Sequence, residues 1–276
     1  MQRLGFWLVT LGWLCLTVEV SGQSLPALQK SLSGWDAAIV IRELRTGGFV
    51  RLNEARLAQE FPPFNTLEIP VALAALETRT VRHLNEVTPW NRLKYPLPDL
   101  AHEDLAHWSE DHTLRSAFTD SVPWYWQDVS ERLGPARLTT HLRKFAYGNQ
   151  QLPADLTQGW QDNALAISAA AQADFLTALV NESLPVSRFQ QQQLKTLLLR
   201  ESGDGYRYYL KTGAGYLQNG NYLGWSIGWL ETSTGVYVFA LNLTQRVPET
   251  ARDATRSLHK QVLAAAGYWP MTDNHP

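Results

Sequence analysis

The sequence of 276 residues contains a single cysteine, Cys15, which lies in an apolar run near the N-terminus. Disulfides, thiol catalysis and cysteine zinc sites are therefore excluded for the rest of the chain. The first 22 residues carry one basic residue, Arg3, followed by apolar residues from Leu4 to Val18 and a short polar end. This order is typical of a secretory signal peptide. We expect cleavage before Gln23 and a periplasmic or secreted mature protein.

The same N-terminal run lacks two features that would anchor the chain in a membrane. It is shorter than the stretch that crosses a bilayer. Leu14 precedes Cys15, whereas a lipoprotein signal has a small residue at that position. We therefore expect no stable membrane anchor.

The sequence also lacks an excess of one charge. Its 24 basic and 26 acidic residues give a formal net charge of −2, and they are mixed along the chain without a basic stripe. Nucleic acid is therefore not an expected partner. The seven histidines show no metal-ligand spacing, so we expect neither a metal nor another cofactor. His102, His107 and His112 lie in a polar stretch and are expected at the surface.

Aromatic residues, by contrast, are abundant: 11 Trp, 10 Tyr and 9 Phe. Buried rings contribute large apolar areas, so a packed core is attainable without disulfides. The sequence contains no internal repeat and no low-complexity segment. We expect residues 23–276 to form one domain.

Hydrophobic patterns divide this domain into three parts. Alternating residues predict an N-terminal hairpin, and a second alternating region begins at Tyr206. The middle of the chain carries helical patterns, and a closing amphipathic helix ends before Gly267. The predicted strands are 35–44, 48–53, 206–211, 222–231 and 235–243, and the predicted helices are 69–76, 114–119, 124–133, 136–145, 172–181, 188–199 and 251–266. Residues 88–110 show no period and are expected to be irregular.

These patterns predict an α+β fold. The antiparallel sheet would combine strands from both ends of the chain, with the mostly helical middle region packed beside it. The predicted helix 69–76 is apolar on all sides, which places it inside the protein.

This apolar helix follows a turn, and together they form the segment Phe61–Glu77. Further short motifs follow in order: Ser121-Val-Pro, Tyr147-Gly-Asn, Gly159-Trp160 ahead of Leu165-Ala-Ile-Ser, Lys211-Thr-Gly, and Gly224-Trp-Ser-Ile-Gly-Trp. The segment and these motifs resemble, in order and spacing, the landmarks of class D β-lactamases. The resemblance extends from about residue 39 to residue 267, essentially the whole mature chain. It implies a β-lactamase/transpeptidase-like fold.

In that family a serine hydroxyl attacks the lactam carbonyl, and a carbamylated lysine acts as the base. By resemblance, Ser121 would relay a proton and Trp160 would hold the carbamate. The substrate-binding strand would consist of Lys211, Thr212, Gly213 and Ala214. An arginine of the last helix would bind the substrate carboxylate, and this would be Arg252 or Arg256.

The two central reactive positions depart from the family pattern. Asn65 stands where the nucleophilic serine is expected, and Glu68 stands where the base lysine is expected. A carboxamide nitrogen is not a nucleophile, so the ordinary acyl-enzyme cannot form at Asn65. Two rescues remain conceivable, namely a water activated by Glu68 or attack by the Thr66 hydroxyl.

Asn65 and Glu68 also have the spacing of a helix capping box. In this structural interpretation both replacements stabilise the helix start after catalysis was lost. Trp160 would then be an ordinary wall residue, or it would contact Glu68.

Taken together, the residues predict an exported class D β-lactamase-like protein with impaired or absent catalysis. A pocket for β-lactams or peptidoglycan peptides would remain. One alternative is an active hydrolase with altered chemistry. Another is a non-catalytic module that binds cell-wall material or a partner protein. The oligomeric state does not follow from the sequence.

Overall fold

The fold is built on a six-stranded sheet whose strand order is β2-β1-β10-β9-β8-β7, with every neighbouring pair antiparallel. The computed structural model describes residues 25–97, 104–152 and 164–270. The strands of this sheet are β1 (Asp36–Glu43), β2 (Phe49–Leu52), β7 (Leu199–Gly203), β8 (Tyr206–Tyr216), β9 (Tyr222–Thr232) and β10 (Val236–Gln245). Because β1 pairs with β10, strands from both ends of the chain share the sheet, and the predicted α+β fold is confirmed.

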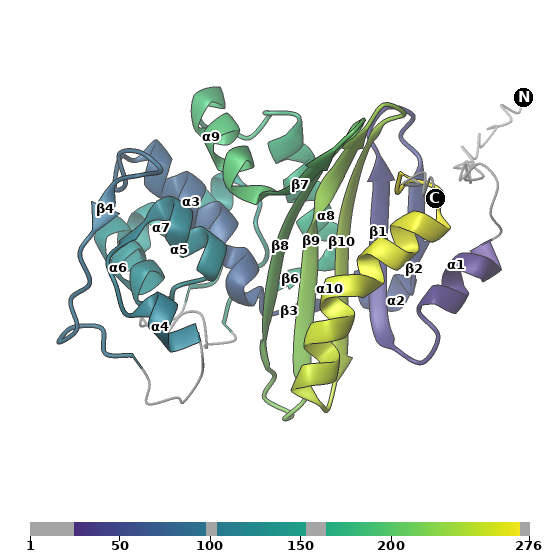
Figure 1. The fold of residues 1–276 in the computed structure, drawn as a ribbon, viewed down its shortest axis with the longest axis horizontal. Coiled ribbons are helices and arrows are strands. Elements are labelled where there is room, and N and C mark those ends of the chain that lie inside the picture. The colour runs from purple at the N-terminus through teal and green to yellow at the C-terminus, as the bar shows by residue number, and fades with distance from the viewer. Residues whose placement is uncertain (1–24, 98–103, 153–163, 271–276) are drawn as a thin grey trace, which may run out of the picture.

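Each face of the sheet carries its own apolar core. On one face, the long helix α10 (Pro248–Ala265) and the short α1 (Leu25–Ser31) cover residues such as Phe239 and Leu241. On the other face, α8 (Ala169–Val180) packs against β1, β9 and β10. The rest of the helical region lies beyond β8, on the side away from α10 (Figure 1).

The helical region surrounds one central helix, α3 (Glu68–Glu77). Every residue of α3 from Glu68 to Leu76 is buried, and the helix contacts α6, α7 and α9. The prediction that this helix, apolar on all sides, lies inside the protein is therefore confirmed. The surrounding helices are α5 (Leu114–Asp120), α6 (Pro123–Leu133), α7 (Pro135–Lys144) and α9 (Arg188–Leu198).

Several short elements differ from the sequence-based predictions. Helix α4 (Asp104–Trp108) lies in the stretch expected to be irregular, and β7 follows α9 directly. Helix α8 begins at Ala169 because the Ser168 side chain accepts a hydrogen bond from the Ala171 N–H at 3.1 Å. Such capping turns are local side-chain chemistry that hydrophobic periodicity does not report.

The remaining elements are α2 (Glu54–Leu57), the 3-10 helix η1 (Phe64–Leu67), and two short antiparallel pairs. β3 (Glu60–Phe61) pairs with β6 (Ile167–Ser168), and β4 (Val87–Thr88) pairs with β5 (His112–Thr113). His112 is buried, so its expected surface location was wrong; its ring is bonded to Ser116 Oγ at 2.9 Å and donates to the His107 carbonyl at 2.8 Å. Within the described ranges, no helix has the length and apolarity needed to cross a bilayer.

Candidate active site

The candidate site begins at η1, where the chain turns into α3. The Trp225 indole N–H donates to the Pro62 carbonyl at 2.8 Å and holds the turn on the sheet. Phe64 adopts a positive φ of 47°. Its ring fills the space above Gly215, where a Cβ atom would come within 2.3 Å of a ring carbon. This arrangement fixes the next residue, Asn65, beside strand β8.

Glu68 is the first residue of α3, and its side chain is turned inward rather than along the helix end. It is 1% exposed. The residues flanking the two helical segments, Pro63 and Leu67, make no side-chain capping hydrogen bond. The predicted capping box of Asn65 and Glu68 is therefore wrong. Instead, the Glu68 carboxylate accepts a hydrogen bond from Lys211, and the nearby Ser121 and Asn65 side chains help to oppose the rise of its pKa.

Lys211 reaches this carboxylate from β8. Its Nζ lies 2.5 Å from Glu68 Oε2, 2.7 Å from the Phe118 carbonyl oxygen and 3.0 Å from Ser121 Oγ. An ammonium group has three N–H donors, so all three are used inside the protein. The Phe118 ring lies beneath Nζ with its centroid at 4.3 Å, which adds a cation–π contact.

Ser121 completes the group from the end of α5. It terminates that helix in the left-handed conformation, with φ 50° and ψ 51°, and its N–H bonds to the Ala117 carbonyl. The next helix, α6, begins two residues later with Pro123 at its first turn, where a missing N–H costs no helical bond. The sequence therefore ends one helix and starts the next so that Ser121 Oγ faces Lys211.

Burial sets the electrostatics of the pair. Desolvation raises the pKa of Glu68, while the Lys211 charge opposes this rise. Desolvation likewise lowers the pKa of Lys211, and Glu68 opposes that fall. Because both shifts favour the uncharged form, a proton shared across the Nζ–Oε2 contact moves between partners more readily than in a solvated pair.

The residues of β8 that follow Lys211 lie alternately on the two faces of the sheet. Side chains alternate along a strand, so Lys211 and Gly213 face η1. A Cβ atom on Gly213 would lie 2.9 Å from both the Pro63 carbonyl and the Thr66 nitrogen, and only glycine fits this contact. Ala214 packs instead with the core under α10. Thr212 shares that face, since its cross-strand partner Ser226 donates to a carbonyl of α10.

Thr66 points away from the group around Lys211. Its hydroxyl donates to the Pro63 carbonyl at 2.7 Å and accepts from Gln172 Nε2 at 2.9 Å. The same amide nitrogen bonds the Tyr147 hydroxyl at 3.1 Å, and Thr66 is 0% exposed. This buried network excludes Thr66 as a substitute nucleophile in the described arrangement.

The two candidate arginines lie on α10 and are both exposed. Arg252 Nε donates to the Tyr222 hydroxyl at 3.2 Å, and its guanidinium lies 5.4 Å from the centroid of that ring. Tyr222 pairs with Tyr216, five positions along β8 from Lys211, which corresponds to about 17 Å of strand. Arg252 therefore lies nearer the far end of β8 than to the Glu68 carboxylate. Arg256 is one turn further along α10.

The structure thus brings together four of the predicted site residues, namely Asn65, Glu68, Ser121 and Lys211. Trp160 falls in the segment 153–163, outside the described residues, so its role stays a prediction. The Phe118 carbonyl is the participant that the sequence did not reveal. Any residue type supplies a backbone carbonyl, so no motif could have indicated it. Among the residues that the structure describes, His, Cys, Asp and Glu form no group suited to a metal ion.

Known proteins share both this sequence pattern and this fold. The family model described as the penicillin binding protein transpeptidase domain matches residues 37–266. The chain is 31% identical to the probable β-lactamase YbxI of Bacillus subtilis over 208 residues, which cover 75% of this chain and 74% of the relative. It is 32% identical to β-lactamase OXA-48 of Klebsiella pneumoniae over 205 residues, covering 74% of each chain.

Solved structures agree with the sequence comparison. The crystal structure of the class D β-lactamase YbXI from Nostoc superposes with a TM-score of 0.79 at 27% identity, covering 88% of this chain and 99% of that one. The residues matched by the family model, 37–266, include α3 and the strand of Lys211. The chain therefore belongs to the penicillin-binding protein transpeptidase family and is a class D β-lactamase-like member of it.

Proposed function

We propose that this chain is an exported class D β-lactamase-like protein that does not form the usual acyl-enzyme and acts by binding β-lactams or peptidoglycan peptides. The observation that carries the proposal is the engagement of Lys211. Its three donors bond Glu68, Phe118 and Ser121, and Asn65 offers no hydroxyl for attack. By resemblance, both the nucleophile and the free lysine charge that a lactamase uses are missing.

Mass spectrometry of intact protein tests the loss of acylation. The mature chain is incubated with a labelled penicillin and examined for a covalent adduct, with an active class D enzyme as the positive control. We expect no adduct of the label on this chain. Stoichiometric labelling would overturn the proposal.

Ligand binding is tested separately by thermal unfolding with purified muropeptides or with an uncleaved β-lactam. A ligand that binds only the folded state raises the free energy of unfolding by RT ln(1 + [L]/Kd). We expect a rise in Tm that saturates with concentration. An unchanged Tm at millimolar ligand would contradict the binding part of the proposal and leave the acylation result untouched.

An altered hydrolase in which Glu68 activates water is the second candidate, favoured by the raised pKa of this carboxylate. Its burial and its bond to Lys211 oppose that role, because a base must reach the water it deprotonates. Turnover of a chromogenic lactam that disappears in Glu68→Ala would support it. We expect a rate equal to that of buffer in both proteins.

The expected processing of the chain is part of the same proposal. Export would remove residues 1–22 and leave residues 23–276 as one domain. N-terminal sequencing of protein recovered from the periplasm is expected to begin at Gln23. A chain that retains Met1 in the cytoplasm would contradict export.

A further inference from the structure

The Glu68 carboxylate joins two groups that can react with each other. It accepts a hydrogen bond from the Lys211 amine at 2.5 Å, and the Asn65 side chain lies close enough to interact with it. Lys211 and Glu68 are 2% and 1% exposed. An amine and a carboxamide on one buried carboxylic acid are the components of a transamidation.

We propose that Lys211 and Asn65 form an intramolecular isopeptide bond, for which Glu68 moves the protons. The bond would join β8 to η1, two segments that are far apart in sequence. It is a modification of the chain itself and does not rest on the proposed ligand binding.

The reaction balances without any co-reactant. The lone pair of the neutral Lys211 Nζ attacks Asn65 Cγ and forms the new C–N bond. Glu68 takes a proton from Nζ and gives one to Asn65 Nδ2, and the Cγ–Nδ2 bond breaks. The products are a secondary amide and one molecule of ammonia, and the Glu68 carboxyl returns to its starting state. No group is oxidised or reduced.

Burial supplies the charge states that this step needs. A protonated amine has no lone pair to attack with, and an ionised carboxylate has no proton to give to the leaving nitrogen. Desolvation lowers the pKa of Lys211 and raises that of Glu68. Transfer of one proton across their hydrogen bond therefore produces the reactive pair.

Close packing holds the two segments in place for the reaction. Gly213, two residues from Lys211 on the same face of β8, would place a Cβ atom only 3.0 Å from the Asn65 nitrogen. Groups fixed in this way react with effective molarities of about 10⁵ M or more when they are well aligned. Ammonia escapes to solvent, which makes the step effectively irreversible at low ammonia concentration.

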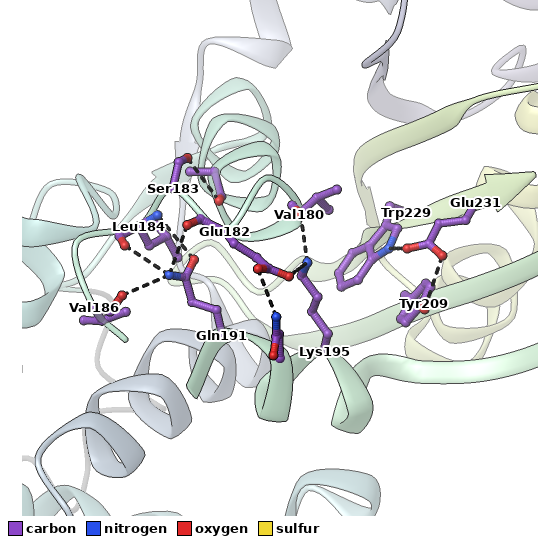
Figure 2. A network of polar contacts seen from close by, with 12 residues as sticks. Val180, Glu182, Ser183, Leu184, Val186, Gln191, Lys195, Tyr209, Trp229 and Glu231 are labelled. Atoms are coloured by element: carbon purple, nitrogen blue, oxygen red, sulfur yellow. Dashed lines mark hydrogen bonds and ion pairs between the residues drawn. The ribbon is translucent and has the colours of Figure 1, made fainter. Parts of the chain in front are cut away.

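The chain contains a matched set of groups that should not react. Lys195 Nζ lies 2.9 Å from Glu182 Oε1, and the Gln192 carboxamide donates to Glu182 Oε2 at 3.1 Å. Figure 2 shows the contact between Glu182, two residues past the end of α8, and Lys195 of α9. The side chain of Lys195 is 19% exposed and that of Glu182 is 25% exposed. This set is much more exposed to solvent than Lys211 and Glu68, so it serves as an internal control.

Peptide mapping of the purified full-length or processed protein tests the proposal. Trypsin does not cleave at an acylated lysine. The bond therefore predicts one branched peptide in which residues 57–79 are joined to residues 208–246 through Lys211, lighter by one ammonia than the sum of its parts. Mapping is required because an N-terminal Gln23 can also cyclise with loss of ammonia. Lys195 is expected to be cleaved normally.

Variants separate the bond from other causes of mass loss. In Asn65→Asp the same attack would release water, so the branched peptide is expected to lose one water instead. In Asn65→Ala the bond cannot form, and cleavage after Lys211 should return. Glu68→Gln keeps the side-chain volume but cannot exchange protons, so it should yield linear peptides. Linear peptides 57–79 and 208–211 from the unmodified sequence would overturn the proposal without reference to any variant.

Discussion

At the scale of single residues, Glu68 determines the partner of Lys211. In the resemblance, position 68 would carry a base and Lys211 would face the substrate. Here a carboxylate at position 68 draws the Lys211 ammonium inward, 2.5 Å from Oε2. A charge buried without its partner is costly, so each member of this pair now requires the other.

The first prediction concerns this mutual dependence. In an Asn65→Ala background, which keeps the pair free of any covalent bond, Glu68→Met or Lys211→Met alone should lower the free energy of unfolding by about 3–5 kcal/mol. The double variant should recover most of that loss, because an apolar pair leaves no unpaired charge. Urea unfolding of the four proteins gives the coupling free energy. Additive losses would show that the two side chains are not energetically coupled.

At the scale of secondary-structure elements, the contact between β8 and η1 depends on a missing side chain. A Cβ atom added to Gly213 would lie 2.9 Å from the Pro63 carbonyl oxygen and 2.9 Å from the Thr66 backbone nitrogen. Backbone atoms cannot rotate away as a flexible side chain can. The geometry of the site is therefore set by how closely these two elements approach.

We predict that Gly213→Ala destabilises the protein by about 1–3 kcal/mol, because the added methyl forces β8 and η1 apart. Gly48→Ala is the control, since the nearest atom to its would-be Cβ is the hydroxyl of Thr46 at 3.2 Å, at the end of a side chain that can rotate. Urea or thermal unfolding measures both. Equal effects of the two substitutions would contradict the close approach at Gly213.

Helix α10 contacts the sheet through a buried histidine. His259 is 0% exposed and stacks on Phe239 at 5.1 Å between centroids. Its Nδ1 bonds the Thr255 carbonyl at 3.1 Å, and since a carbonyl only accepts, Nδ1 carries the proton. Nε2 then accepts from the Tyr208 hydroxyl, and the neutral ring is fully bonded. Desolvation lowers the pKa of His259 to about 4.

The lowered pKa of His259 predicts acid sensitivity. Above pH 6.5 the ring is neutral in both folded and unfolded chains, so its titration contributes nothing to the pH dependence. Between pH 6.5 and about 4 the unfolded chain takes up the proton first, and the free energy of unfolding falls by about 3 kcal/mol. Urea unfolding at pH 7 and pH 4.5 should show this fall, and His259→Gln should show less of it. The same fall of the free energy of unfolding with pH in both proteins would contradict the assignment of this effect to His259.

At the scale of the whole molecule, the chain has the family fold, and the resemblance implies a reactive centre that differs from the family pattern. The structure superposes on the class D β-lactamase from Nostoc over 88% of the chain. The rest of the site should therefore still suit the family's chemistry, unless Pro123 has altered the turn at Ser121.

A reversion pair tests this expectation. Asn65→Ser with Glu68→Lys restores a hydroxyl and a base, and it removes the carboxylate that draws Lys211 inward. We expect covalent labelling by penicillin, measured by intact mass, that neither single reversion gives to the same extent. An inert double variant with an unchanged fold would show that the loss extends beyond the two positions, and Pro123→Val would be the next substitution to add.

The sequence by itself determined the fold and the list of candidate residues. Periodicity separated the strands from the helices, and the apolar run of α3 placed that helix in the interior, because burial on all sides requires apolar residues on all sides. The ordered motifs located Ser121 and Lys211 and marked Asn65 and Glu68 as exceptions. These properties follow from residue type and spacing, which a sequence carries directly.

Only the tertiary structure decided what those residues contact. Asn65 and Glu68 have the spacing of a capping box, and local pattern alone favoured that interpretation. Lys211 lies 143 positions from Glu68 in sequence, and their pairing arises because β8 packs on η1 across Gly213. The Phe118 carbonyl oxygen, which accepts a hydrogen bond from Lys211, cannot be recognised from residue type. A buried carboxylate must have a charged or donating partner. Which group becomes that partner depends on long-range packing, so it could not be predicted from the sequence.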